Sequence, residues 1–360
     1  MTKNQELTLV LLRAGLGTQK ADPALFKGLS PQDWNEINRT AHLQGVGALV
    51  WDGIRQSPTE IVPPKELIYK WAIFTEKIKK HNQLHQHTIV RLAKNISSEG
   101  IKMMVVKGVS LARLYPMPEH REAGDVDCHF FGAEERVEEI MKADGGLIER
   151  MPRSHHDICR YRGVLFEVHH CFVPPVYEIE KFIGDRLNKL LTLPQQEYTI
   201  EGATLYFPNR EFECLFTFFH ATKHLIGEGI VWRHLCDLAL LMREHRPDLC
   251  RIRALFATRG MRHMFDALCH LTVDLIGAPP ELVADLSRHP KLERRLNEEI
   301  LQGHLFLFRK HRNGVGKFVY RVRNMIRREW KQRMAYNRSC VPDLPQKLLR
   351  LITHPLHYFQ

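Results

Sequence analysis

The sequence has no long hydrophobic run and no cysteine pattern that points to disulfide or metal chemistry. No stretch approaches the roughly 18 apolar residues that a bilayer-spanning helix needs, and the N-terminal residues lack the basic start of a secretory signal. The 8 cysteines are widely spaced, without a CxxC or zinc-finger interval, which favours reduced structural thiols. We therefore expect a cytoplasmic protein without a transmembrane segment.

Internal repeats and low-complexity segments are also lacking, and the composition is that of a protein with an apolar core. The 360 residues are 44% hydrophobic and 26% charged, close to globular averages, which excludes disordered and fibrous classes. At ordinary domain sizes this length predicts two or three packed units. Hydrophobic periodicity predicts helices over 1–98, an α/β core over 99–207 and helices over 208–360. The fold class we expect is α+β.

Acidic residues are scarce near the C-terminus. Residues 305–340 contain 11 lysines and arginines but one acid, Glu329, so this segment accounts for +10 of the net charge of +11. Apolar residues at helical spacing over 317–334 predict a basic amphipathic helix. Such a helix either docks on the core with a solvated face or binds a membrane surface or a polyanion. We expect it to bind an anionic acceptor, with RNA as the leading candidate.

The central segment is expected to form a small mixed sheet. Its apolar, alternating stretches are bounded by glycine and proline, as strands usually are. The predicted strands cover residues 101–106, 125–131, 156–161 and 164–170, with helices over 109–114 and 134–141. The last two strands flank Arg162–Gly163 and are expected to form a hairpin.

Two carboxylates at the start of the second predicted strand are the strongest chemical signal. Asp125 and Asp127 alternate with an apolar residue, so they point to the same face of the strand. Adjacent carboxylates repel unless a cation neutralises them, and hard oxygen ligands suit Mg²⁺. Glu167 lies between Phe166 and Val168, where an unpaired acid would be costly. The three acids predict a site for Mg²⁺ or Mn²⁺.

A phosphate-binding turn is expected just before these acids. Lys107 and Gly108 follow the first strand and precede a helix, where free backbone N–H groups favour phosphate. Ser110 adds a hydroxyl, and Arg121 adds a charge between the turn and the acids. Strand alternation places His169 on the same face as the third acid. These five residues are expected to contact the nucleotide.

The string VVKGVSLARLYPMPEHREAGDVDCHF, with FEVHH some forty residues on, resembles a known family. It is similar to the uncharacterised bacterial nucleotidyltransferases of the DNA polymerase beta-like superfamily. The resemblance covers roughly residues 100–245, because HATKHLIGEGIVWRHLCDLALLM is similar to the family's helical segment with spaced His, Lys and Trp-x-x-x-Asp-Leu. This chain carries Lys107-Gly108 where superfamily members usually carry Gly-Ser.

The resemblance implies a nucleotidyltransferase-type mixed sheet flanked by helices and a metal-dependent transfer of NMP from an NTP. ATP is the expected nucleotide, and the acceptor hydroxyl belongs to RNA, a protein or a small molecule. Asp125 and Asp127 would hold two Mg²⁺ ions, and Glu167 would share one of them. Two alternatives stay open. One is a catalytically silent nucleotide- or RNA-binding protein, and the other is a regulator that modifies RNA or protein by the same chemistry.

Histidines and charged pairs in the helical part admit ordinary structural explanations. His220 and His224 share one helix face, but the sequence between them lacks the glutamate of a zinc protease. They are either partly buried helix residues or, together with Lys223, nucleotide contacts. Arg233 and Asp237 are expected to form a pair on the helix surface. The remaining histidine pairs, at 155–156 and 169–170, could belong to a metal site, but we favour roles in the hairpin and in support of the site's ligands. His169 is the exception, because strand alternation places it beside Glu167.

Overall fold

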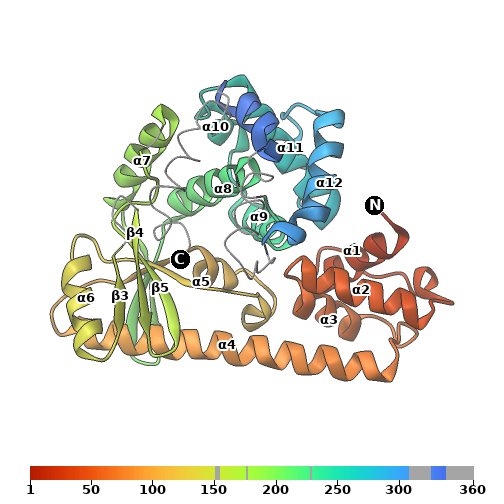
Figure 1. Ribbon diagram of the computed structural model, residues 1–360, viewed down its shortest axis with the longest axis horizontal. Helices are drawn as coiled ribbons and strands as arrows, with labels where there is room; N and C mark the ends of the chain where they lie inside the picture. Colours follow the sequence, from red (N-terminus) through yellow and green to blue (C-terminus); the bar gives the residue numbers. More distant parts are fainter. Residues whose placement is uncertain (151–154, 176, 228, 308–325, 338–360) are drawn as a thin grey trace.

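The computed structural model describes residues 1–150, 155–175, 177–227, 229–307 and 326–337 (Figure 1). The N-terminal part is helical, as predicted: α1 (Lys3–Gly15), α2 (Pro31–Leu43), α3 (Gly47–Gln56) and the 33-residue α4 (Lys65–Ser97). Helices α1 and α3 cross in close contact, because a Cβ at Gly15 would lie 2.0 Å from the Leu49 carbonyl oxygen. Only glycine allows that approach.

Helix α4 connects the N-terminal helices to the sheet. In Figure 1 it runs along one side of the molecule, with α1–α3 at one end and the strands at the other. Near its start, Trp71 stacks on Trp51 of α3 at 6.2 Å between ring centroids. Near its end, Ile89, Leu92 and Ile96 are buried under the sheet. One helix therefore fixes both parts relative to each other.

The sheet has seven strands in the order β3-β4-β5-β2-β1-β7-β6. Strand β2 pairs in parallel with β5 and antiparallel with β1, and β1 pairs in parallel with β7. The strands are β1 (Met104–Val106), β2 (Val126–His129), β3 (Leu147–Glu149), β4 (His156–Tyr161), β5 (Val164–His169), β6 (Gln196–Ile200) and β7 (Ala203–Phe207). Helices α5 (Lys107–Ala112), α6 (Glu134–Ala143) and α7 (Glu178–Leu191) lie between them. The mixed sheet confirms the predicted α+β class.

Three strands and one helix of this region were not predicted from the sequence. Strands β3, β6 and β7 are short, and neither β3 nor β6 contains a buried residue. Helix α7 was also missed. The predicted strand over 101–106 begins only at Met104, and the predicted helix begins earlier, at Lys107 rather than residue 109.

The C-terminal region is helical, as predicted, and covers one face of the sheet. It contains α8 (Arg210–Ile226), α9 (Trp232–His245), α10 (Leu249–Ala254), α11 (Arg259–Ile276) and α12 (Pro290–Leu307). Short 3₁₀ helices occupy Pro23–Phe26, Pro118–His120 and Pro280–Val283. Gln44 connects the N-terminal helices to the C-terminal region. Its side-chain amide donates to the Ile300 carbonyl at 3.2 Å and accepts from the backbone N–H of Trp232 at 3.0 Å. The proposed division at 98 and 207 stays a prediction.

The described part of the basic segment, residues 326–337, includes a helix that packs on this region. Lys331 is buried, donates to the Leu225 carbonyl at 2.6 Å and pairs with Glu299 at 2.8 Å. Its ammonium is therefore a structural group. That residues 305–340 bind an anionic acceptor stays a prediction. Residues 308–325 and 338–340, which carry most of the other charges, lie outside the described residues. None of the described helices is long and apolar enough to cross a membrane.

Candidate active site

Strand pairing brings two of the three predicted acids together. In the parallel pairing of β2 with β5, Asp127 lies opposite Glu167, and His169 follows two residues later on the same face. The Nε2 atom of His169 lies 2.8 Å from Asp127 Oδ1 and 3.8 Å from Glu167 Oε2. Ligand atoms of these three residues all lie within 4.8 Å of one another. Two carboxylates and an imidazole are a donor set that fits a divalent cation.

Asp125 lies just before β2 and lines the same cavity, although it is outside that three-residue cluster. The cavity holds about 620 Å³ between the sheet and helices α8 and α9. Its wall includes the predicted residues Lys107, Gly108, Arg121, Asp125, Asp127, Glu167 and Lys223. Pockets of this size accommodate a nucleotide-sized ligand.

Lys107, the residue directly after β1, extends its side chain to the cluster of acids. It adopts a left-handed conformation with φ of 49° at the start of α5, which costs a non-glycine residue roughly 1 kcal/mol. This conformation places its ammonium 2.6 Å from Asp127 Oδ1. Burial alone would raise the pKa of Asp127, but the charge of Lys107 and the hydrogen bond from His169 hold it well below its usual value. Asp127 is therefore ionised.

Glu167 behaves in the opposite way. Burial, followed by the negative charge of Asp127, raises the pKa of Glu167 to about 8. Burial and Asp127 also raise the pKa of Asp125. The site thus combines one firmly ionised carboxylate, Asp127, with two carboxyl groups whose pKa values are raised, Asp125 and Glu167. Ionising these two places further negative charge beside Asp127. A divalent cation would relieve this repulsion, so the residues present fit a metal ion.

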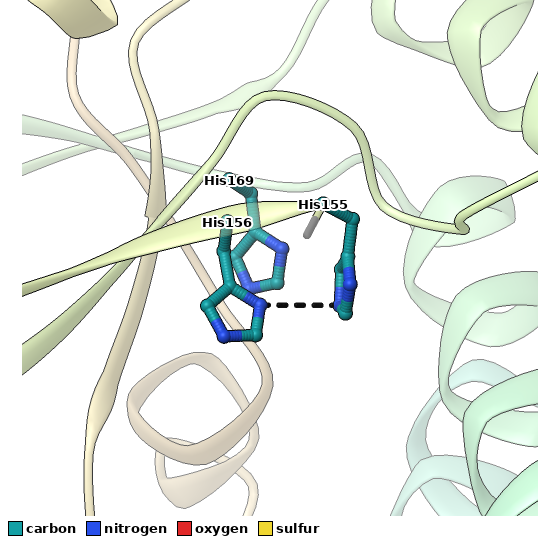
Figure 2. A group of neighbouring side chains, drawn as sticks. All are labelled: His155, His156 and His169. Atoms are coloured by element: carbon teal, nitrogen blue, oxygen red, sulfur yellow. Dashed lines mark hydrogen bonds between the residues drawn. The ribbon is translucent and has the colours of Figure 1, made fainter. Parts of the chain in front are cut away.

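Three histidines form a second group beside these acids (Figure 2). Ligand atoms of His155, His156 and His169 lie within 4.8 Å of one another, and His156 Nδ1 is 3.3 Å from His155 Nε2. His156 Nε2 also lies 3.7 Å from Glu167 Oε1. Burial lowers the pKa of His155 to about 3, which keeps this imidazole neutral. The sequence interpretation favoured hairpin and supporting roles for 155–156 over a metal site, and the structure places this pair beside the acids.

Arg121 is held in a buried ion pair at the cavity wall. Its Nε and Nη2 atoms each donate to a different oxygen of Asp237 at 2.7 Å, and Tyr115 donates to the same carboxylate at 2.6 Å. The expected surface pair between Arg233 and Asp237 is therefore wrong, because Asp237 is buried and its bidentate partner comes from another element. A Cβ at Gly108 would lie 3.3 Å from Arg121 Nη1.

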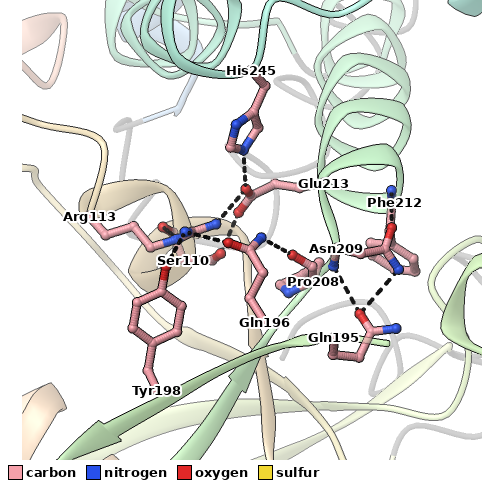
Figure 3. Close-up of polar contacts among 10 residues, drawn as sticks. All are labelled: Ser110, Arg113, Gln195, Gln196, Tyr198, Pro208, Asn209, Phe212, Glu213 and His245. Atoms are coloured by element: carbon pink, nitrogen blue, oxygen red, sulfur yellow. Dashed lines mark hydrogen bonds and ion pairs between the residues drawn. The ribbon is translucent and has the colours of Figure 1, made fainter. Parts of the chain in front are cut away.

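Ser110 lies elsewhere. Figure 3 shows its hydroxyl directed to Glu213 of α8, where Arg113 and His245 also bind. The Arg113 guanidinium lies 2.7 Å from Glu213 Oε2, and His245 Nε2 lies 2.8 Å from the same oxygen. Ser110 is fully buried in this network and does not line the cavity. The Ser110 hydroxyl is therefore not available to a phosphate group in the cavity.

Lys223 lies on the wall opposite the sheet. It extends from α8 and pairs with Glu180 of α7 at 2.8 Å. His220 and His224 lie on the same helix, with ring centroids 4.2 Å apart, and both line the cavity. Burial holds the pKa of His220 well below its usual value. The helical wall therefore places Lys223 and the neutral imidazole of His220 across from the acids.

The mixed sheet, with acids on adjacent strands facing a cavity under helices, defines a nucleotidyltransferase-like α+β protein. Comparison with known families agrees: a family described as uncharacterised nucleotidyltransferase matches residues 30–277. The chain belongs to this family. No significant match is found among curated proteins or among solved structures. The match begins at Ser30, just before α2, and ends just after α11, so it includes α2, α3 and α4, which the sequence resemblance left out, but not α1.

Proposed function

We propose that the protein transfers a nucleoside monophosphate from an NTP to an acceptor hydroxyl, in a reaction that depends on a divalent cation. The observation that carries this proposal is the convergence of Asp127, Glu167 and His169 at one end of the cavity, with Asp125 in the same wall. When bound there, Mg²⁺ or Mn²⁺ would neutralise phosphate charge and polarise the reacting oxygens. Asp127, Glu167 and His169 would hold it, and Asp125 would complete the set as the cation draws the carboxylates together.

The other residues of the wall bind and orient the nucleotide. Lys107 and Lys223 supply positive charge on two sides of the cavity, which suits a triphosphate. Gly108 leaves room for phosphate to approach the backbone beside Arg121. In the transfer, a bond forms between the acceptor oxygen and the α-phosphorus while the bond to pyrophosphate breaks. The acceptor proton passes to Asp125 or to solvent.

The test uses ATP, GTP, CTP and UTP labelled at the α- or γ-phosphorus, with Mg²⁺ or Mn²⁺ and fractionated cell extract as the acceptor source. Transfer of α-label to a macromolecule or small product, with release of γ-label as pyrophosphate, supports the proposal. Transfer of γ-label instead would identify a kinase and contradict it. Asp127→Asn should abolish transfer, whereas Asp185→Asn, at an exposed position of α7, serves as the matched control.

A second candidate is a silent nucleotide-binding protein. The observation that favours it is the ion pair of Lys107 with Asp127, because an ammonium 2.6 Å from the carboxylate already supplies part of the positive charge that a metal would bring. This candidate predicts NTP binding of equal strength with and without a divalent cation, and no transfer of α-label. The first candidate predicts binding that strengthens with the cation. Equilibrium binding in EDTA and in Mg²⁺ separates the two.

A further inference from the structure

A second group of metal-type ligands lies on the opposite face of the sheet. Glu138 of α6, Asp157 of β4 and His170, just after β5, have ligand atoms that all lie within 4.8 Å of one another. Asp157 lies opposite Val168 in the pairing of β4 with β5, and Val168 belongs to the apolar layer against α4 and α6. These three residues therefore share no face with the nucleotide cavity, and the group is independent of the function proposed above.

The environment of the Glu138 side chain is the observation that points to a ligand. Its side chain is 3% exposed, and among the described residues its Oε1 atom is buried without a hydrogen-bond partner. A buried carboxylate oxygen without a partner is destabilising, more so beside a second carboxylate. Among the described residues, Arg150 has its Nη2 atom 3.6 Å from Glu138 Oε2 and a 65% exposed side chain. Such a contact is weak and leaves the inner oxygen unsatisfied.

We propose that Glu138, Asp157 and His170 bind a divalent transition-metal cation of the Zn²⁺ type. Two carboxylate oxygens and one imidazole nitrogen suit Zn²⁺, whereas Mg²⁺ takes oxygen ligands and usually keeps its water. Zinc bonds of about 2.1 Å place ligand atoms roughly 3.4 Å apart in a tetrahedral site. Only small side-chain rotations are needed to reach this spacing. His170 Nε2 already lies 2.8 Å from Asp157 Oδ2, and its side chain is 41% exposed, which gives the ion an entry path.

The position of the site gives the ion a structural role. Alternation along the strands places His156 on the cavity side of the sheet and Asp157 on the opposite side, and likewise the buried His169 on the cavity side and His170 on the opposite side. An ion held by residues from both strand ends and from α6 would fix this end of the hairpin. It would thereby fix the backbone that carries the two cavity histidines, without contacting the nucleotide.

The experiment uses the full chain, stripped of metal and then exposed to Zn²⁺ alone. Crystals measured on both sides of the zinc absorption edge should show an anomalous peak between Glu138, Asp157 and His170. Zinc should also raise Tm by about 3 °C or more at a concentration 100 times Kd. Mg²⁺ at the same concentration should not produce this rise.

Variants separate this site from the cavity, where the three histidines can also hold zinc. Glu138→Gln and His170→Gln should each lower the bound zinc by one ion per chain. Glu139→Gln changes a neighbouring glutamate whose side chain is 67% exposed and should bind as much zinc as the wild type. His170 is at the surface, so its variant is expected to fold even if the Glu138 variant does not. Absence of the anomalous peak, or unchanged zinc content in His170→Gln, would overturn the proposal.

Discussion

The two faces of β2 and β5 carry opposite chemistry. On the face toward α4 and α6, Val126, Cys128 and Phe166 are fully buried in an apolar layer. On the face toward α8 and α9, Asp127 and Glu167 come together at the cavity. Because side chains alternate, a step of one residue separates a core position from a site position. Substitutions on the two faces should therefore have separable effects, on stability and on transfer.

The largest effect is expected at Asp127. Asp127→Asn keeps the shape of the side chain but removes the charge that holds Lys107 and a metal ion. Transfer should fall by roughly a thousandfold or more, which corresponds to about 4 kcal/mol of transition-state stabilisation. Initial rates with α-labelled NTP measure the loss, and near-UV circular dichroism checks the fold. Retention of a tenth or more of the activity would remove Asp127 from the site.

The opposite face should give the reverse result. Phe166→Ala removes a fully buried ring from the apolar layer, so the free energy of unfolding should fall by about 3–5 kcal/mol. Urea titration measures this loss. Transfer per folded molecule, measured well below the denaturation midpoint, should stay within about threefold of the wild type. An inactive yet fully stable variant would mean that the two faces are not separable in this way.

Glu167 should affect the rate more than nucleotide binding. Glu167→Gln removes one proposed metal ligand and leaves Lys107 and Lys223 in place to bind phosphate. We expect kcat to fall about a hundredfold while Kd for the NTP changes less than about fivefold. Single-turnover rates and equilibrium binding measure the two quantities separately. Equal changes in both would assign Glu167 to binding alone.

Lys107 links charge to backbone strain. Lys107→Ala and Lys107→Gly both remove the ammonium, so both should weaken NTP binding by about tenfold. Only glycine adopts φ of 49° without strain, so the glycine variant should be more stable than the alanine variant by about 1 kcal/mol. Fluorescence binding and thermal unfolding provide the comparison. Two variants of equal stability would show that the left-handed conformation is not retained in solution.

The smallest effect concerns His85, a buried polar residue of α4 on the apolar side. Burial lowers the pKa of His85 to about 4, below the value near 6.5 of an unfolded chain. The unfolded chain therefore binds the proton first as pH falls, and stability present above pH 6.5 is lost toward pH 4. This loss is about 1 kcal/mol between pH 7 and 5.5. His85→Leu should remove that part of the pH dependence, measured by urea unfolding at both pH values.

The sequence predicted the elements that carry the acids because their signals are local. Alternation around Asp127 and Glu167 marks strands, and apolar neighbours mark their buried face. The parallel register that brings the two residues together is not a local property, so the sequence could predict only that both acids lie in one sheet. Strand β6 contains no buried residue, so it lacks the signal of a buried face. Helix α7 and strand β7 do follow helical and strand periods, so the sequence contained the signal that the interpretation missed.

Side-chain partners across the fold were the least predictable part. Asp237 and Arg121 are 116 residues apart, and no spacing rule connects them. The position of Ser110 after Lys107 predicts a phosphate ligand, but its hydroxyl donates a hydrogen bond to Glu213 of α8. His155 gave only a weak signal, as one of 21 histidines. The tendency of buried imidazoles to cluster near carboxylates could have made His155 a stronger candidate for a site residue.

The proposed function depends on where a nucleotide and a metal ion bind. The direct measurement is a crystal structure of the wild-type protein with Mn²⁺ and a non-hydrolysable NTP analogue. We predict an anomalous manganese peak coordinated by Asp127 and Glu167, with the triphosphate between Lys107 and Lys223. A nucleotide bound outside this cavity, or a triphosphate in the cavity with no metal at Asp127, would contradict the central claim.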